Sequence, residues 1–441
     1  MARYTTEAGP RMFSIATARA VAVDGAGNVY VTGITYVGSQ MPPDWLTVKY
    51  SPSGAQQWVA RYNGPANGPD EAQALAVDAT GNVYVTGYSN GLGTSSDYTT
   101  VKYSTDGQRL WEARYNGPAN GNDRAEDVAL DSAGNVYVTG YSTGAVAGYT
   151  TLKYAPSGQQ LWVARYDRPG QSGSFAEALA VDAAGNVAVT GYSYGDDRSS
   201  GADYATVKYS TEGQQLWEAI YNGPGNDFDQ AQGVAMDAAG NVFVTGFVLG
   251  PELRTADYAT LKYSPTGRLL WTALYNGPGN GDDTARDLAV DAAGNVLVTG
   301  VSQGSSLQSD YATLKYAPDG QPLWEARYDG PGHGDDMANA LALDAAGNAY
   351  VTGSSGGNSG TFVDYATVKY SPAGQQLWVA RYDGPIKRKT GPVRWPWMCG
   401  ATSTSRVIPP APALPAPART TPPLNTRSRG WPSPPRSATV P

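Results

Sequence analysis

The sequence predicts an all-β protein, a β-propeller of seven four-stranded blades of about 54 residues each, followed by an irregular Pro-rich tail. The first observation is a repeated pattern, Asp-x-x-Gly-Asn-Val-x-Val-Thr-Gly with small changes, whose Asn recurs at positions 28, 82, 135, 186, 241, 295 and 348. The second is that each repeat contains four short strand-like runs. The third is composition, since Tyr 30, Trp 11, Gly 54 and only 16% charged residues suit short strands and tight turns rather than helices.

The second repeat shows the four runs, which we call a, b, c and d, at residues 74–78, 82–88, 97–103 and 109–116. Runs b and c are β-branched or aromatic on both faces, so both faces must be covered, as they are when neighbouring blades sandwich each sheet. Between a and b, Asp-x-x-Gly-Asn favours an Asx turn with the Gly at positive φ. Between c and d, Ser-Pro-x-Gly favours a type I turn with a bulge. Radial packing of such repeats gives a propeller, and a linear β-solenoid is the alternative.

Only the loop between runs b and c changes length from repeat to repeat. In an up-and-down blade the a–b and c–d turns share one end, so the b–c loop and the crossover from d to the next a share the other. One face of the disc is therefore expected to vary. Loops carried on a rigid scaffold are where binding usually occurs, so this variable face is the predicted binding face.

Repeat boundaries divide the chain into three parts. Residues 18–385 carry the seven complete repeats and form the predicted propeller domain. Residues 1–17 precede it as a partial repeat or N-terminal strand, because residues 2–4 match residues 60–62 at the end of a repeat. Residues 386–441 hold 13 Pro, nine Lys or Arg and no Asp or Glu, a composition typical of a disordered tail.

The tail also reads as an eighth repeat in a shifted frame. Codons for residues 394–407, shifted by one base, can spell Leu-Ala-Val-Asp-Val-Arg-Gly-Asn-Val-Tyr-Val-Thr-Gly, and those for residues 420–426 can spell Asp-Tyr-Ala-Thr-Leu-Lys-Tyr. The hidden Asn straddles positions 401 and 402, and a step of 54 from Asn348 places it at 402. One nucleotide deleted between about codons 385 and 394 would give this offset. The codon due for the Trp of that repeat departs from the pattern, since its shifted reading cannot be Trp.

The charge balance argues against nucleic acid as a partner. The chain has a formal net charge of -8, but without the nine basic residues of the tail, residues 1–385 carry 22 Lys or Arg and 39 Asp or Glu, a net -17. Such a body should repel nucleic acids and anionic membranes. No apolar run approaches the roughly 20 residues that span a bilayer, and no signal-peptide core follows Met1, so membrane insertion is not expected.

Side chains for many kinds of catalysis are scarce. Cys399 is the only cysteine and His333 the only histidine. The sequence therefore has too few of these residues for a multi-His metal site or a redox pair of cysteines, and only one His for a Ser-His-Asp triad. His333 falls in a crossover loop and is expected to be solvated. We therefore expect no enzymatic activity, and a hydrolase or a quinoprotein dehydrogenase is the least favoured class.

Four motifs that recur in fixed order resemble a known family. They are VDAAGNVLVTG at residues 290–300, DYATLKYSPTG at 257–267, QQLWVARY at 375–382 and NGPGNGDD at 276–283. They are similar to the SBBP, or seven-bladed beta-propeller, repeat of bacterial proteins, and the resemblance covers roughly residues 18–385. It implies a propeller, often in envelope or secreted proteins, and brings no defined activity and no catalytic residues. An extracellular or cell-envelope location is expected on this ground alone.

The variable loops and crossovers supply the candidate site residues. Exposed apolar, aromatic and charged side chains in the b–c loops are candidates for binding contacts. These are Met41, Tyr194, Asp196, Asp197, Arg198, Phe247, Leu249 and Leu253. Acidic residues five positions after the crossover Pro could hold Ca²⁺ or ring a channel mouth, or could equally form Asx turns leading into run a. These are Asp70, Asp123, Asp229, Asp283 and Asp336, with Ser174 at the equivalent place in the fourth repeat.

The expected function is that of a non-enzymatic scaffold that binds a protein or a surface polymer through the face carrying the b–c loops and the crossovers. The alternative is a lectin-like propeller that binds carbohydrate, with Ca²⁺ assisting, because Tyr- and Asp-rich loops suit contacts with sugars. Apart from that Ca²⁺, no cofactor is expected. The Trp repeated in run d of every unit is expected to pack between blades rather than to form a ring of ligand platforms.

Overall fold

The computed structural model describes residues 14–37, 42–168, 173–195, 201–250, 255–356, 364–382 and 407–408. The chain divides into two compact units, Met1–Pro410 and Ala411–Pro441, and the described residues all lie in the first. These residues form strands, turns and loops, and no helix among them could cross a lipid bilayer. The predicted tail, residues 386–441, lies outside the described residues apart from Val407–Ile408.

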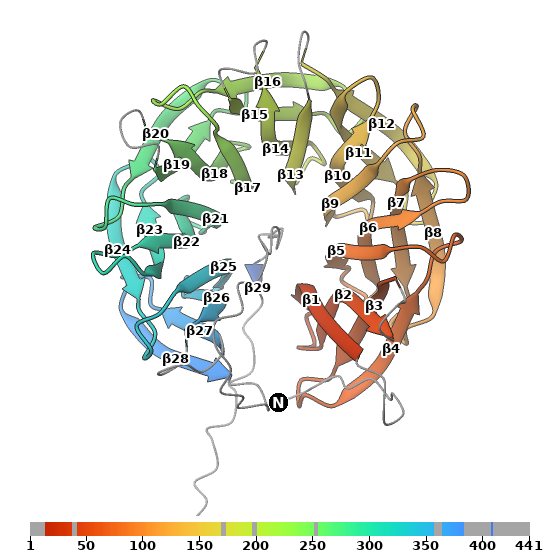
Figure 1. The fold of residues 1–441 in the computed structure, drawn as a ribbon, viewed down its shortest axis with the longest axis horizontal. Coiled ribbons are helices and arrows are strands. Elements are labelled where there is room, and N and C mark those ends of the chain that lie inside the picture. The colour runs from red at the N-terminus through yellow and green to blue at the C-terminus, as the bar shows by residue number, and fades with distance from the viewer. Residues whose placement is uncertain are drawn as a thin grey trace, which may run out of the picture. The chain divides into compact units, whose positions relative to one another are not determined.

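The strands form seven antiparallel four-stranded sheets that stand as blades around a central axis (Figure 1). This confirms the predicted fold class. Blades 1 and 2 contain β1 (Ser14–Val23), β2 (Val29–Val37), β3 (Asp44–Tyr50), β4 (Gln56–Tyr62), and β5 (Asp70–Val77), β6 (Val83–Asn90), β7 (Ser96–Tyr103), β8 (Arg109–Tyr115). Blades 3 and 4 contain β9 (Asp123–Leu130), β10 (Val136–Thr143), β11 (Ala147–Tyr154), β12 (Gln160–Tyr166), and β13 (Ser174–Val181), β14 (Val187–Tyr194), β15 (Ala202–Tyr209), β16 (Gln215–Tyr221).

Blades 5 to 7 follow the same order. Blades 5 and 6 contain β17 (Gln230–Met236), β18 (Val242–Leu249), β19 (Ala256–Tyr263), β20 (Leu269–Tyr275), and β21 (Asp283–Val290), β22 (Val296–Gln303), β23 (Ser309–Tyr316), β24 (Pro322–Tyr328). Blade 7 contains β25 (Asp336–Asp344), β26 (Ala349–Ser355), β27 (Asp364–Tyr370), β28 (Gln376–Tyr382). A short strand, β29 (Val407–Ile408), pairs in parallel with the inner strand β25.

In each blade the first strand lies nearest the axis and the fourth lies at the rim (Figure 1). The tight turns have the predicted chemistry. Asp78 Oδ1 accepts hydrogen bonds from the backbone N–H of Thr80 and of Asn82, and Gly81 between them has a φ of 86°. The c–d turn of the same blade places Gly107 at a φ of 85°, and the register shifts at Tyr103. Both turns lie at one end of the ring, which we call the turn face.

The inner strands begin earlier than the sequence pattern suggested. In blade 2 the strand starts at Asp70 rather than at residue 74, because Asp70 already pairs with Ser89 across a bulge at Gln73. The bulge inserts one extra residue and breaks the alternation of polar and apolar residues by which strands are recognised. For the same reason β1 begins at Ser14, so residues 14–17, assigned from sequence to the N-terminal partial repeat, belong to the inner strand of blade 1.

The hydrophobic cores lie between neighbouring blades. One cluster combines Tyr30 and Trp45 of blade 1 with Leu75, Val83 and Val85 of blade 2, all of them buried. Equivalent clusters recur from blade to blade. Both faces of blades 2 to 6 are therefore covered by their neighbours, which explains why runs b and c are apolar on both sides.

A Trp on the outer strand links each of blades 1 to 6 to the next one. Trp217 of blade 4 donates from its indole Nε1 to the carbonyl oxygen of Pro265 in the c–d turn of blade 5, at 2.9 Å. Its ring lies against Gly267 of that turn, where an added Cβ would come within 2.7 Å of the indole. The same indole-to-turn bond is made by Trp58, Trp111, Trp162, Trp271 and Trp324. In blades 1 to 6 the repeated Trp thus packs between blades, as expected, whereas Trp378 of blade 7 is 38% exposed.

Candidate functional site

The end of the ring opposite the turn face carries the b–c loops and the crossovers, and we call it the loop face. The five predicted acidic residues all lie there and are buried. Asp336, for example, accepts hydrogen bonds from the backbone N–H of Gly330 at 2.6 Å and of Gly356 at 2.9 Å. The corresponding bond from the Gly six residues upstream is made to Asp70, Asp123, Asp229 and Asp283.

These carboxylates join the crossover to the inner strand and the end of strand b. Burial is the main cause that raises the pKa of each one, and it raises that of Asp229 to about 6. Hydrogen bonds from the backbone partly oppose this effect. In blade 4 the same place is held by Ser174, whose hydroxyl bonds that of Ser193 at 2.8 Å. The geometry is that of a side chain that caps the crossover by accepting its backbone N–H groups. These hydrogen bonds occupy carboxylate oxygens that Ca²⁺ would need.

One group of acidic side chains within the described residues is close enough to share an ion. Oxygen atoms of Asp310, Asp329 and Asp336 lie within 4.8 Å of one another. Two of the three already face a basic partner. Arg327 donates to Asp310 at 2.9 Å, and the exposed His333 lies 2.6 Å from Asp329 through its Nδ1. His333 is therefore a solvated residue of the crossover, as the sequence suggested.

The predicted binding residues separate into two groups. Tyr194, Phe247 and Leu249 lie at or near the ends of β14 and β18 on the loop face, and all three are half-buried. The backbone N–H of Leu249 donates to Asp229 at 3.1 Å. Met41, Asp196, Asp197, Arg198 and Leu253 lie outside the described residues.

Tyr194 and Phe247 belong to a continuous row of aromatic side chains, which we call the aromatic row. Phe175 stacks on Tyr192 with ring centroids 5.2 Å apart and an interplanar angle of 21°. Phe228 lies 5.6 Å from Tyr192, 6.2 Å from Tyr194 and 6.0 Å from Phe247. At the other end, Tyr141 lies 5.0 Å from Phe175. The row crosses blades 3, 4 and 5, and all six rings are half-buried.

Polar side chains of the inner strands lie beside the row, and we call them the inner polar cluster: Arg19, Glu71, Arg124, Glu126, Glu177 and Gln230. Arg124 Nε lies 2.6 Å from Glu126 Oε1, and its guanidinium lies 5.3 Å from the ring centre of Tyr88. Gln230 donates to Glu177 at 3.1 Å. Arg19 of blade 1 lies 3.6 Å from Glu71 of blade 2. The cluster therefore extends over the inner strands of five blades.

Two glutamates of this cluster have strongly raised pKa values. Burial raises the pKa of Glu126 to about 7, against the opposing effect of Arg124 and Arg19. Burial, followed by the nearby Glu126, raises the pKa of Glu177 to about 8. Both carboxyl groups can therefore be protonated near neutral pH, where each can donate and accept hydrogen bonds.

The sequence held a signal for this site that the repeat analysis missed. Glu126 and Glu177 occupy the bulge of their inner strands, where the other blades have Arg19, Gln73, Gln232, Arg286 and Asn339. Every residue at this place is polar, and its identity changes between otherwise similar repeats. A position whose residue varies between repeats is not constrained by the packing between blades that fixes its neighbours. The bulge position also lies on the strands that surround the axis (Figure 1).

Comparison with known proteins agrees with the repeat pattern. Residues 57–93, 113–150 and 270–308 match the SBBP beta-propeller repeat. The chain carries SBBP repeats. No curated protein matches the sequence.

Two solved structures are similar to this chain in fold. The periplasmic gluconolactonase PpgL of Pseudomonas aeruginosa is 14% identical with a TM-score of 0.47, over 80% of this chain and 94% of that one. The WD40 domain of SCAP from fission yeast is 11% identical with a TM-score of 0.44, over 86% and 93%. The expectation that a propeller of this kind has no enzymatic activity is corrected, since propellers similar in fold include an enzyme, the gluconolactonase. That expectation rested on the scarcity of His and Cys and ranked activity from carboxylates alone as least favoured, whereas carboxyl groups with raised pKa can transfer protons by themselves.

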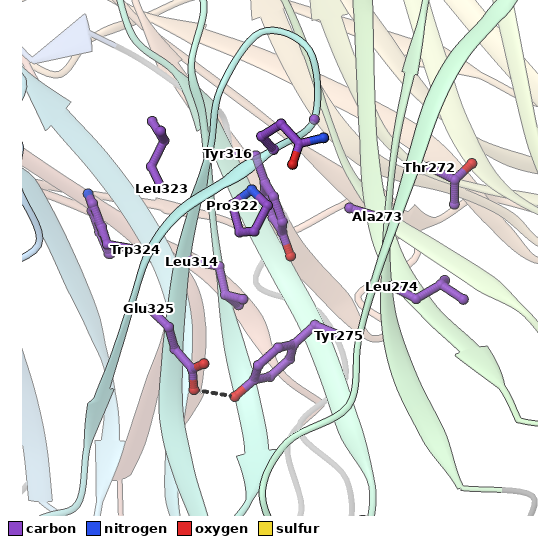
Figure 2. A pocket seen from close by; sticks show the side chains of 12 residues that line it. Thr272, Ala273, Leu274, Tyr275, Leu314, Tyr316, Pro322, Leu323, Trp324 and Glu325 are labelled. Carbon is purple, nitrogen blue, oxygen red and sulfur yellow. Dashed lines mark hydrogen bonds between the residues drawn. The ribbon is translucent and has the colours of Figure 1, made fainter.

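Two hollows lie away from the aromatic row, and both are formed by positions that recur in every repeat. A groove of about 500 Å³ lies at the rim between β20 and β24 (Figure 2). There Tyr275 donates to Glu325 at 2.6 Å across the blade junction, as Tyr62 does to Glu112 at 2.8 Å in blades 1 and 2. A second cavity, of about 690 Å³, lies at the turn face and is lined by apolar ends of the inner strands, among them Val77, Leu130, Val181, Met236, Val290 and Leu343.

Proposed function

We propose that this SBBP propeller binds a carbohydrate polymer through its loop face, at the aromatic row and the inner polar cluster. The observation that carries the proposal is the row itself, six half-buried rings in mutual contact across three blades. Rings that pack into a core are covered, as Tyr204 and Tyr258 are in the blade junctions, where they are 0% and 1% exposed. The rings of the row keep part of their surface open at the face where loop length varies.

The chemistry of the cluster suits a neutral sugar. Apolar C–H faces of a sugar ring can pack on aromatic side chains, while its hydroxyl groups need partners that donate and accept. Arg124 and Gln230 supply donors, and the carboxyl groups of Glu126 and Glu177 supply both functions when they are protonated. A mixed set of this kind, beside flat rings, favours a hydroxylated ligand over a purely apolar one.

The site is confined to one side of the ring, which favours an extended ligand that crosses a few blades. The position of Tyr192 on strand b is occupied by Val301 in blade 6, Ser354 in blade 7 and Ile34 in blade 1. Those blades therefore offer no aromatic ring at the equivalent place. A polymer segment lying on the row would contact blades 3, 4 and 5 in succession.

A glycan array probed with the full chain tests this function. We expect binding to a polysaccharide or oligosaccharide that is weakened about three- to tenfold by Phe228→Ala, which removes the ring at the centre of the row. Val301→Ala, at the strand position in blade 6 that Tyr192 holds in blade 4, is the control for a change on this face away from the row and should leave binding unchanged. Absence of binding to any glycan, together with capture of a protein through the loop face, would assign the face to the other ligand class.

The array is read with and without a chelator. We expect the same binding in both, because the buried carboxylates of the loop face already accept hydrogen bonds from backbone N–H groups. Loss of binding in the chelator would instead support the Ca²⁺-assisted form of recognition.

A further inference from the structure

Six junctions join the seven blades, and they share one set of contacts. On strand c, a Tyr hydroxyl donates to a backbone carbonyl of strand c in the next blade, as Tyr311 of blade 6 does to Ala366 of blade 7 at 3.1 Å. On strand d, the Trp indole donates to the following c–d turn, as Trp324 does to Pro372 at 3.0 Å. In blade 1, Trp45 takes the place of this Tyr and donates to Tyr88 of blade 2. Each blade thus has a donating face and a receiving face.

The donating face of blade 7 is exposed within the part of the chain that the structure describes. Tyr365, the counterpart of Tyr311, is 63% exposed, whereas Tyr311 is 0% exposed. Trp378, the counterpart of Trp324, is 38% exposed. Lys369 bonds the hydroxyl of Tyr350 in its own blade, whereas the equivalent Lys315 reaches the turn of the next blade. These are the groups that insert into a following blade everywhere else in the ring.

The receiving face of blade 1 is exposed in the same way. Val21 is 58% exposed, whereas its counterparts in the other blades are buried, among them Leu75 at 1% and Leu341 at 4%. Val29 and Val31 are half-buried, although the equivalent Val83 and Val85 of blade 2 are 0% exposed. Extended contacts link each inner strand to the next from β1 to β25, but contacts of that extent do not link β25 back to β1. In Figure 1 blades 7 and 1 lie on either side of the place where the ring of blades is interrupted.

We propose that an eighth SBBP blade closes this ring, and that it is encoded by the DNA that now specifies the tail. The two exposed faces are complementary halves of the junction used six times within the chain, so the occupant that fits both is a blade of the same repeat. A second observation, independent of the structure, indicates which DNA encodes this blade. The shifted reading of residues 394–407 can spell strands a and b of one more repeat, and that of residues 420–426 can spell strand c.

The hidden reading permits the required side chains on both faces. Its Leu-Ala-Val-Asp places Leu at the receiving position, equivalent to Leu75, where it would meet Tyr365 and Trp378 of blade 7. Its Asn-Val-Tyr-Val places Tyr at the donating position, equivalent to Tyr84, where it would cover Val21 of blade 1. The Trp position of that repeat is not Trp, so the last junction lacks one of the shared contacts.

The test restores the reading frame by inserting one base between codons 385 and 394 and compares the restored chain with the unaltered one. Tyr365→Ala is introduced into both chains, and Tyr311→Ala serves as the reference for a filled junction. In the unaltered chain we expect Tyr365→Ala to leave the urea midpoint unchanged. In the restored chain it should lower the midpoint about as much as Tyr311→Ala does, and the restored chain should sediment as a monomer.

A second variant keeps the test decisive if the restored tail does not fold. In it, residues 383–441 are replaced by a further copy of residues 329–382, which supplies a complete eighth blade. A Tyr365→Ala effect equal to that of Tyr311→Ala in either eight-blade chain supports the proposal. The proposal is overturned if Tyr365→Ala has no effect in both, or if the unaltered chain forms multimers that Tyr365→Ala disperses, because the occupant is then a second copy of the chain.

Discussion

The contact between a Trp and the turn of the next blade can be tested with two glycines of blade 6. Gly320 lies in the c–d turn with a φ of 88°, and a Cβ added there would come within 2.8 Å of the indole of Trp271. Gly294 lies in the a–b turn of the same blade with a φ of 79°, and its Cβ would meet nothing closer than Pro318 at 3.6 Å. Alanine at either place adopts a left-handed backbone, but only at Gly320 does it also meet the neighbouring blade.

The expected difference follows from these distances. A left-handed backbone costs an L-residue about 1–2 kcal/mol, so Gly294→Ala should lower the free energy of unfolding by that amount. Gly320→Ala adds the overlap with Trp271, whose ring is fixed by its bond to Pro318 and by contacts with Phe243 and Tyr316. Overpacking of a filled site typically costs about 1–3 kcal/mol, so Gly320→Ala should be the more destabilising by that margin.

Urea unfolding followed by tryptophan fluorescence measures both variants. The double variant Trp271→Leu with Gly320→Ala separates the two terms, because once the indole is removed Gly320→Ala should cost only as much as Gly294→Ala. The coupling energy from this cycle should equal the extra cost, about 1–3 kcal/mol. Equal losses for Gly320→Ala and Gly294→Ala, or a coupling energy near zero, would refute a packed contact between the indole and the turn.

Two further predictions concern the loop face. Because the folded pKa values of Glu126 and Glu177 are raised, the folded state binds more protons than the unfolded state above pH 4.5, so their contribution to stability is lost as pH rises through about 7 to 8. The urea midpoint should fall as pH rises from about 4.5 to about 8. The double variant Glu126→Gln with Glu177→Gln should show a smaller fall. An unchanged fall would contradict the raised pKa values of these two glutamates. Asp336→Asn leaves one backbone N–H facing an amide donor and should cost about 1–3 kcal/mol. The loss should be the same in Ca²⁺ and in chelator, and a loss seen only in Ca²⁺ would instead identify the carboxylate as an ion ligand.

The blades were predictable because their signals are local. Asp78 and Gly81 form the expected turn because an Asx bond and a positive φ involve residues only a few positions apart. Runs b and c were recognised from their own residue types. The start of the inner strand was missed because the bulge at Gln73 breaks the local alternation, and pairing with strand b decides where that strand begins.

The candidate site was only partly predictable. Tyr194 and Phe247 were singled out from their loops, but the row that joins them passes through Phe228, which precedes an inner strand of the next blade. Glu126 and Glu177 lie on inner strands of different blades, about 50 residues apart in sequence, and their protonation depends on mutual burial. The five acidic residues lie on the loop face, and only their backbone partners distinguish a cap from an ion site.

The sequence by itself determined the repeat, the blade and its turns, because each blade is specified by contacts within about 54 residues. The tertiary structure alone decided which variable residues converge on the axis and which blade faces are covered. Tyr311 and Tyr365 occupy the same place in nearly identical repeats, yet one is buried and the other 63% exposed. The physical reason is that a blade buries its faces only against its neighbours, so the exposure of a residue depends on what stands beside its blade.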